Sequence, residues 1–323
     1  MKNVRFVIKC ILALLPVLAV VLYTAVVPFG YMDSEFPAWK YTKDTVCDSS
    51  ANTVILGDSR AMADLIPEMF EVNTVNLSVG GATSIEMYYT LKKYIENNGQ
   101  PENVIIMFAP FHYSVIDNFW TRTAYFNYLS VKDMTDLYSY AEATGSETLL
   151  CKGYKNDLLS YRLRFPDKYL PALMNSKIVG RYNENVETYK QIKENLGYGE
   201  FGTADGCSDL NYETSYEEMH TTADAVLLDL YLNKLLKLCV DNKINTTLAI
   251  PPMNQSSYEA LNPSYVDELH FYFVGLSHNY PGIIINDEIP MYEDMYFGDS
   301  SHLNHSGAVK FTEEFIHFLL SIS

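Results

Sequence analysis

A short apolar run that ends in a glycine, an acid and a serine most constrains the fold of this chain. The residues of 54–56 are β-branched or bulky and too few for a helix, so they predict a buried strand that leaves the sheet at Gly57. Ser59 then stands at the carboxyl end of that strand, the edge where open α/β sheets bind ligands and place chemistry. Ser59 is therefore a candidate nucleophile. A plain β-turn, which uses the same residue types, is the alternative.

The N-terminus carries a second strong signal. Residues 1–9 contain three basic side chains and no acid, and 10–29 are uncharged and mostly apolar. At about 1.5 Å rise per residue, a helix over 10–29 spans roughly 30 Å, which matches the hydrocarbon core of a bilayer. The basic flank predicts a cytoplasmic N-terminus, a single-pass anchor in the cell membrane over 10–30 and an extracellular remainder. A cleavable signal peptide is the alternative, although the apolar run is long for one.

The composition narrows the class of partner. The chain has a formal net charge of −17 and is 48% hydrophobic, which suits a folded domain with a sizeable core beyond the anchor. Nucleic acid is a poor partner, because its binding depends on clustered Lys and Arg that neutralise phosphates. The sequence has no CxxC or HExxH pattern and its seven histidines are scattered, so we expect neither a metal nor another cofactor.

Four cysteines lie beyond the anchor, where an extracellular location permits disulfides. They allow three pairings, and the sequence leaves the choice among them open. One of them, Cys239, stands in an apolar helical stretch and is expected to be a small core residue. The four are Cys47, Cys151, Cys207 and Cys239.

Apolar runs and helical patterns alternate through most of the chain. Further strands are expected over 72–79, 104–108, 244–250 and 282–286, and helices over 61–70, 83–97, 222–242, 258–277 and from a cap at Ser306 to Leu320. This order predicts an α/β domain over 53–323 with a five-stranded parallel sheet and right-handed crossovers. Residues 31–52 are expected to form a stalk between the anchor and that domain.

The alternation is lost over about 111–220, which is rich in Tyr, Phe and Asn and holds short helical patterns at 133–144 and 186–196. An insertion of this size at the carboxyl end of a strand is expected to form a mostly helical cap over the Ser59 pocket. Aromatic rings there are able to stack on sugars, but most are expected to form the core of the cap.

Three groups of residues together carry the chemistry of serine catalysis. A serine hydroxyl needs a base to take its proton, and an imidazole needs an acceptor that holds its tautomer. Asp299 and His302 are three residues apart just before the last helix, a spacing that lets the carboxylate reach one ring nitrogen. Gly81 follows the second strand, where its backbone amide is a candidate oxyanion donor. The G-x-S-x-G elbow of α/β-hydrolases is absent, because Ala61 replaces the second glycine.

Gly57-Asp58-Ser59, Gly81 and Asp299-x-x-His302, in this order and at these strand ends, resemble the SGNH, or GDSL-like, hydrolase family. The resemblance runs from the first strand to the last helix, without the insertion. It implies a flavodoxin-like αβα sandwich in which Ser59 is the nucleophile and donates its amide to the oxyanion. It also implies Gly81 as the second donor, His302 as the base and Asp299 as its orienting partner.

One block departs from the family pattern. Where the family places G-x-N-D after the third strand, this chain has Ala-Pro-Phe-His at 109–112, so the asparagine donor is missing. Losing one oxyanion donor costs about 2.7–4 kcal/mol of transition-state stabilisation. His112, Tyr113 and Asn254 are the candidate replacements. The alternative for His112 is a histidine packed under the cap.

The chain looks like a membrane-anchored subset of the family because of its anchor, its insertion and its Gly-Asp-Ser-Arg block. Arg60 in this block is a further candidate substrate contact. This subset is similar to the DltD proteins of teichoic-acid D-alanylation and to the SGNH partners of membrane-bound O-acyltransferases. The resemblance implies an extracytoplasmic esterase or acyltransferase that acts through an acyl-Ser59 intermediate. Its partners would be an O-acylated cell-surface polysaccharide or teichoic-acid-like polymer, and a membrane-bound O-acyltransferase. The alternatives are a catalytically weak, glycan-binding or partner-binding domain, and a lipid esterase.

Overall fold

A five-stranded parallel sheet forms the centre of the protein. The computed structural model describes residues 2–26, 31, 33–150, 153–162, 178–206 and 222–322. The strands of the sheet are β1 (Thr53–Gly57), β2 (Thr74–Asn76), β3 (Asn103–Met107), β4 (Asn245–Ala249) and β6 (Ile284–Ile285), in the order β2-β1-β3-β4-β6. Two further short strands, β5 (Met253–Asn254) and β7 (Met291–Tyr292), pair with each other. The prediction of an α/β fold with a five-stranded parallel sheet is confirmed.

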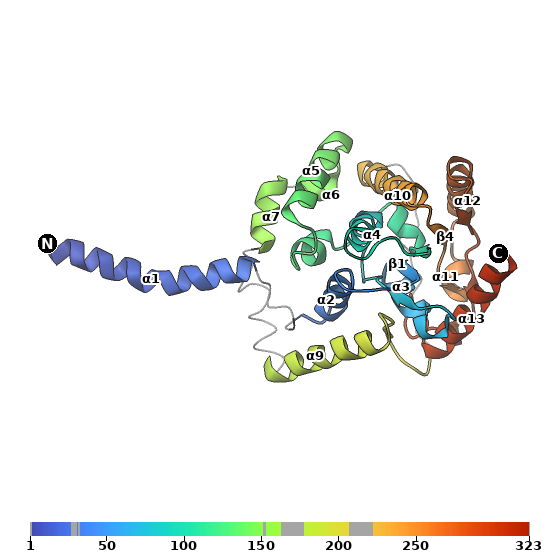
Figure 1. Cartoon of the computed structure of the whole chain (residues 1–323), viewed down its shortest axis with the longest axis horizontal. Helices are drawn as coiled ribbons and strands as arrows, with labels where there is room; N and C mark the ends of the chain where they lie inside the picture. The colour runs from blue at the N-terminus through green and yellow to red at the C-terminus, as the bar shows by residue number, and fades with distance from the viewer. Residues whose placement is uncertain are drawn as a thin grey trace.

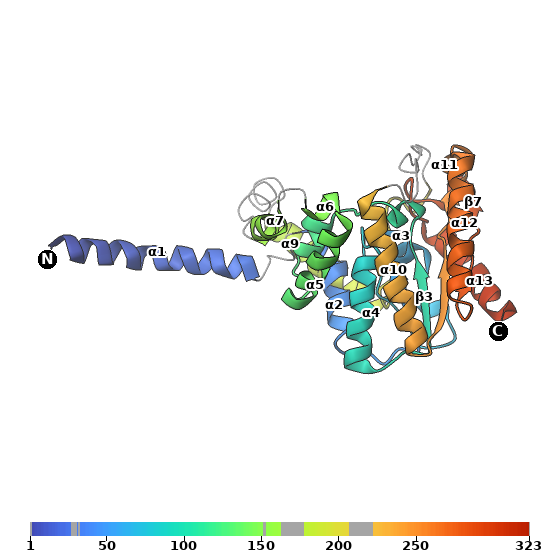
Figure 2. The same cartoon turned by 90° about the horizontal axis from the view of Figure 1, so that it is seen from above.

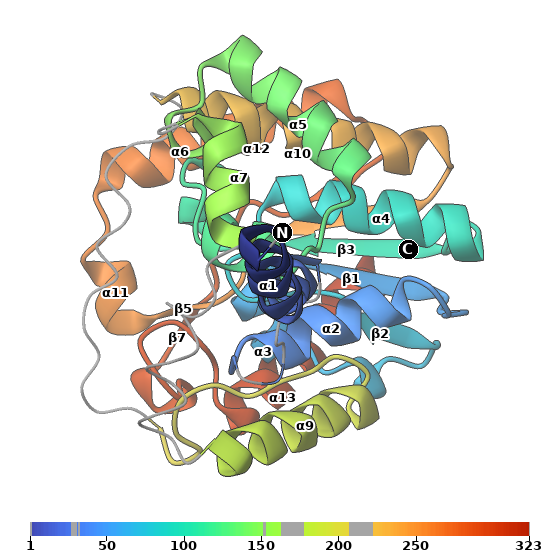
Figure 3. The ribbon, with the colours of Figure 1, turned by 90° about the vertical axis from the view of Figure 1, so that its left-hand side faces the viewer.

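Helices cover both faces of the sheet (Figure 3). They are α4 (Ser84–Asn98), α10 (Ala223–Asp241) and α12 (Pro263–Asn279) on one side, and α3 (Ser59–Asp64) and α13 (His305–Ser321) on the other. Val54 and Leu56 belong to the same buried cluster as the first group of helices, whereas Ile55 between them belongs to the cluster with α3 and α13. Alternate side chains of one strand thus fill two layers. Each fully buried side chain of this size contributes about 1.5–3 kcal/mol to stability.

Helix ends follow local capping chemistry. The predicted capping box of α4 is present: Glu86 accepts from the backbone N of Thr83 at 2.9 Å. The prediction that Ser306 caps the last helix is wrong. Asn304 Oδ1 caps α13 by accepting from the backbone N of Gly307, and Ser306 donates to that same oxygen. The helix expected over 258–277 is two helices, α11 (Gln255–Glu259) and α12, because Pro263 suits only a first turn.

The segment 31–52 is part of the folded domain and not the stalk we expected. It contains α2 (Phe36–Thr45), whose Trp39 is only 1% exposed in the main hydrophobic cluster. Thr42 also donates its hydroxyl to the carbonyl of Leu77 beyond β2, at 3.3 Å. On its other side, α2 packs along α9 (Ile178–Glu194), as Figure 1 shows.

The N-terminal helix α1 (Lys2–Val26) projects away from the rest of the protein (Figures 1 and 2). Its window 3–20 has a mean hydropathy of 2.0 and is not buried at all. A helix of this length and composition is able to cross a membrane or to serve as a signal anchor. It begins earlier than the predicted 10–30, because the basic flank is helical too.

The described part of the insertion is mostly helical. It comprises the 3₁₀ turn η3 (Pro110–Tyr113), the π-helical turn η4 (Phe119–Ala124), α5 (Val131–Thr144), α6 (Glu147–Leu150), α7 (Tyr154–Arg162) and α9. Figure 2 shows α5, α6 and α7 at the end of the molecule from which α1 leaves. Many of its large aromatic side chains, such as Trp120 and Phe126, are buried, whereas Tyr140 and Tyr182 are exposed. Cys47 and Cys239 are free thiols, and Cys239 is buried as predicted. Cys151 and Cys207 lie outside the described residues.

Candidate active site

Ser59, His302 and Asp299 form one hydrogen-bonded chain. Ser59 opens α3 directly after β1, and the other two lie in the loop before α13. His302 Nε2 is 2.8 Å from Ser59 Oγ, across 243 positions of sequence. His302 Nδ1 is 2.9 Å from both carboxylate oxygens of Asp299. The structure therefore brings the three predicted catalytic residues together in the geometry of a serine–histidine–aspartate triad.

The environment keeps Asp299 ionised. Burial would raise the pKa of this carboxyl, but the hydrogen bond and charge of His302 outweigh it, together with the backbone amides of Ser301 and His302. The pKa of Asp299 falls to about 2. An ionised acceptor places the imidazole proton on Nδ1, and Nε2 is then free to accept the proton of the Ser59 hydroxyl.

Three contacts fix the loop that carries His302. Asp64 Oδ1, at the end of α3, accepts from the backbone N of Leu303 at 3.1 Å. The ring of Phe201 stacks on the imidazole, with centroids 4.4 Å apart and planes 20° from parallel. Asn254 donates from Nδ2 to the carbonyl of Ser300 at 2.6 Å. Asp64 and Phe201 escaped the sequence analysis, because neither belongs to a motif and their contacts come from distant segments.

Asn254 makes two side-chain hydrogen bonds, and neither tests the oxyanion role that the sequence predicted for it. Its Oδ1 caps α11 by accepting from the backbone N of Ser257 at 2.7 Å, while its Nδ2 holds the Ser300 carbonyl. The oxygen of the amide is therefore engaged in the cap of α11, and its nitrogen holds the loop that carries His302. The structure gives no contact that supports an oxyanion role for Asn254.

The turn before Ser59 is tied to the end of β3 by a buried acid. Asp58 Oδ2 accepts from the backbone N of Ala109 at 2.7 Å and lies 2.6 Å from His112 Nδ1, while Oδ1 accepts from the backbone N of Arg60. Burial would raise the pKa of Asp58, but the hydrogen bond and charge of His112, with Ala109 and Arg60, hold it below its ordinary value. Asp58 is thus a fully buried carboxylate paired with a histidine.

His112 and Tyr113 are both buried where the structure places them. His112 is 4% exposed, and its Nε2 is shielded from solvent and has no partner in the described ranges. The ring of Tyr113 packs on Phe273, and its buried hydroxyl likewise has no partner there. Neither side chain contacts Ser59 or Gly81, so the oxyanion role stays a prediction for both. The alternative of a packed histidine agrees better with the position of His112.

Two backbone amides are available at the nucleophile. Gly81 has a φ of +73°, a conformation that side chains other than glycine rarely adopt. The preceding Gly80 lies against Ser59, since a Cβ built on Gly80 would be 3.8 Å from that of the serine. The amides of Ser59 and Gly81 donate to no acceptor in the part of the chain that the structure describes. They are thus free to donate to a ligand.

A cation from the insertion lies beside these glycines. A Cβ built on Gly81 would be 2.7 Å from Nη1 of Arg122, which belongs to η4. The guanidinium of Arg122 also lies 3.6 Å from the carboxylate of Glu35. No motif marked Arg122 in the sequence, although it is the one Lys or Arg in 111–131. Arg60, by contrast, is buried at 2% exposed and contributes its backbone amide to the turn.

No family profile matches the chain, and no curated protein matches it. Among the residues with described positions, no group of three or more His, Cys, Asp or Glu side chains is able to hold a metal ion.

Proposed function

We propose that this chain is a membrane-anchored serine esterase or acyltransferase of the SGNH type. The observation that carries the proposal is the hydrogen-bonded chain from Ser59 through His302 to Asp299 at the carboxyl end of β1. The strand order β2-β1-β3-β4-β6 corresponds to the 2-1-3-4-5 order of flavodoxin-like sheets, which supports an αβα sandwich. The apolar helix α1 supports anchoring, with the domain on the outer side of the membrane.

The proposed reaction begins with attack of Ser59 Oγ on an ester carbonyl, while His302 Nε2 takes the hydroxyl proton. The carbonyl oxygen becomes an oxyanion in a tetrahedral intermediate. When this intermediate collapses, the bond to the leaving alcohol breaks and His302 returns the proton to that alcohol. Water or a sugar hydroxyl then attacks the acyl-Ser59, again with His302 as the base, and frees the serine.

Two amides and one cation are the groups available to stabilise the oxyanion. The amides of Ser59 and Gly81 supply the hydrogen bonds in this proposal, and Arg122 supplies positive charge beside them. Because the chain lacks the asparagine donor of the family pattern, stabilisation of the oxyanion in this proposal depends more on the charge of Arg122. It also favours a second candidate function, that of a catalytically weak domain that assists a membrane-bound O-acyltransferase.

The proposed substrate is an O-acyl group on a cell-surface polysaccharide or teichoic-acid-like polymer. Two features support a polymer over a free metabolite as the substrate. The anchor would hold the site near the cell surface, and the insertion lies beside the nucleophile. A lipid esterase is the competing substrate class. Turnover of acetylated xylan or wall polymer above that of long-chain lipid esters would separate the two.

Covalent labelling tests the proposal directly. The full-length protein in detergent is treated with a fluorophosphonate probe, beside Ser59→Ala and the control Ser50→Ala, which removes an exposed hydroxyl far from the triad. We expect the probe to label the natural protein and Ser50→Ala but not Ser59→Ala. Labelling that persists in Ser59→Ala would overturn the assignment of the nucleophile.

A further inference from the structure

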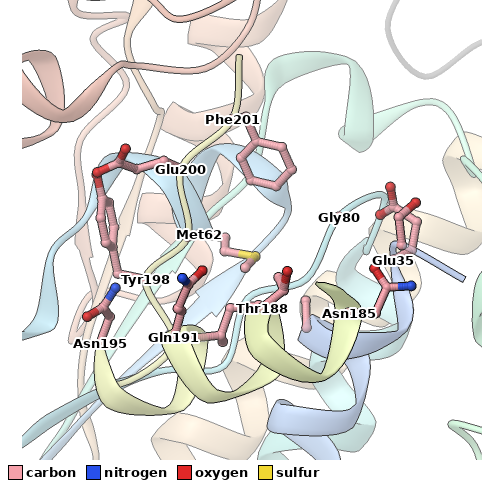
Figure 4. A pocket seen from close by; sticks show the side chains of 14 residues that line it. Glu35, Met62, Gly80, Asn185, Thr188, Gln191, Asn195, Tyr198, Glu200 and Phe201 are labelled. Carbon is pink, nitrogen blue, oxygen red and sulfur yellow. The ribbon is translucent and has the colours of Figure 1, made fainter. Parts of the chain in front are cut away.

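A cavity of about 680 Å³ opens beside the candidate nucleophile (Figure 4). One wall is formed by a face of α9 and the turn directly after it, on which Thr188, Gln191, Ile192 and Asn195 recur at helical spacing. The other walls come from the start of α2, from Met62 of α3 and from the segment 198–201. None of these residues belongs to a motif that the sequence analysis assigned.

The cavity reaches the active site at two points. Gly80 lines it, and this glycine abuts Ser59. Phe201 lines it as well, and its ring stacks on the imidazole of His302. A molecule bound in the cavity would therefore lie next to both the nucleophile and the base.

Two side-chain amides that make no hydrogen bond to a described residue line the α9 wall. The side chains of Gln191 and Asn195 are exposed and form no hydrogen bond to any residue that the structure describes. Figure 4 shows both on the cavity side of α9, with Met62 and Phe201 across from Gln191. Amides supply donors and acceptors at once, and a ring beside a thioether offers an apolar surface. Hydroxyl groups and the C–H face of a sugar need this combination.

The charges of the lining disfavour anions. Two carboxylates, Glu35 and Glu200, line the cavity, and no Lys, Arg or His is among its lining residues. Their partners lie outside that lining: the guanidinium of Arg122 is 3.6 Å from Glu35, and His305 Nδ1 is 3.1 Å from Glu200. Like charges repel a ligand that carries carboxylate or phosphate.

We propose that this cavity is the subsite that holds a sugar unit without negative charge, next to the ester that reacts at Ser59. The position of the sugar relative to the ester rests on the proposed function, whereas binding of the sugar itself does not. The amides of Gln191 and Asn195 hydrogen-bond its hydroxyls, and Phe201 and Met62 cover its apolar face. The polymer whose acyl groups are processed is then a neutral or amino-sugar glycan and not a polyanion.

Calorimetric titration of the full-length Ser59→Ala protein tests the subsite without turnover, in a detergent that has no sugar headgroup. The probes are the neutral pentasaccharides of the cellulose, xylan and N-acetylated chitin series, and pentagalacturonate as the anionic counterpart. We expect at least one neutral probe to bind and the anionic probe to bind at least tenfold more weakly. Combined Gln191→Ala and Asn195→Ala should weaken the neutral probe by about tenfold or more, as expected for two lost hydrogen bonds.

Asn183→Ala is the matched control, because it removes an exposed amide of α9 that does not line the cavity. Failure of every neutral probe to bind at millimolar concentration, or equal binding by the double variant and the control, overturns the subsite. Preferred binding of pentagalacturonate also overturns it. Ester hydrolysis without sugar binding would refute the subsite alone. Sugar binding that depends on the two amides, in a protein that cleaves no ester, would refute the proposed function and leave the subsite standing.

Discussion

Removal of the His112 side chain should destabilise the protein far more than removal of an exposed histidine. His112 supplies one of the three hydrogen bonds that Asp58 makes with described residues, and both side chains are almost fully buried. His112→Ala would leave two backbone amides on a buried carboxylate without its partner. Breaking a buried pair in this way costs about 3–5 kcal/mol in the free energy of unfolding.

The matched control is His270→Ala, because His270 pairs with Asp287 at the surface and its side chain is 57% exposed. An exposed pair contributes only about 0–1 kcal/mol. The assay is thermal unfolding of full-length variants in detergent, followed by circular dichroism. A loss of 3–5 kcal/mol lowers the melting temperature by about 6 °C or more.

Two further measurements separate the lost pair from the space left by the ring. The double variant Asp58→Asn with His112→Ala keeps the cavity left by the imidazole ring but removes the charge of the Asp58 carboxylate. It should therefore be more stable than His112→Ala alone. Burial is the largest influence on Asp58 and raises its pKa once His112 is gone. A raised pKa in the folded state means that protonation favours folding, so the defect of His112→Ala should shrink between pH 8 and pH 5. A defect equal to that of His270→Ala, or one independent of pH, would refute the reasoning.

Asp299→Asn should lower kcat for ester hydrolysis on the order of 10³–10⁴-fold, since the amide no longer holds the required tautomer. The pKa of Asp299 is about 2, below its ordinary 3.8. The ionised carboxylate therefore stabilises the folded state above about pH 4, and this contribution is lost as the pH falls through 2. Acid titration of Asp299→Asn should show no such loss. Gly81→Ala should lower the melting temperature and the esterase activity, because alanine at this positive φ adds about 1–2 kcal/mol of strain. Gly275→Ala should have no such effect, because Gly275 lies within α12 and a Cβ there would contact no other atom. Asn304→Ala should cost about 1 kcal/mol in chemical denaturation, and more than Ser306→Ala, because Asn304 caps α13.

Patterns that depend on neighbours in sequence were predictable. The strand before Gly57 and the capping box at Thr83 follow from side-chain volume and from hydrogen bonds that span a few residues. The triad motifs were recognisable for the same reason, since Asp299 and His302 lie within one loop. That Ser59 would meet His302 was implied by the resemblance to the SGNH hydrolases and not by a local pattern.

Features that depend on distant contacts were not predictable. Residues 31–52 have a mixed composition with a proline and several Asp and Ser, which predicted a stalk. Trp39 is nevertheless buried, because distant parts of the fold pack around it. Arg122 carried no local signal, and it becomes relevant only because η4 lies against Gly81. Phe201 is one aromatic residue among many in the sequence until the structure stacks it on His302.

Residues 109–112, which follow β3, differ from the pattern of the SGNH hydrolases that the chain resembles, and their side-chain contacts differ accordingly. In the family pattern, an asparagine there reaches the oxyanion; in this chain, Ala109 and His112 both bind Asp58 and so hold the end of β3 against the turn of Ser59. These contacts tie the turn that carries Ser59 to the end of β3, and residues 109–112 offer no asparagine donor. Under the proposed function, stabilisation of a transition state would rely on the two amides, on the charge of Arg122 and on contacts with remote parts of the substrate. The cavity beside Ser59 is where such remote contacts are available, which links the altered block to the proposed glycan subsite.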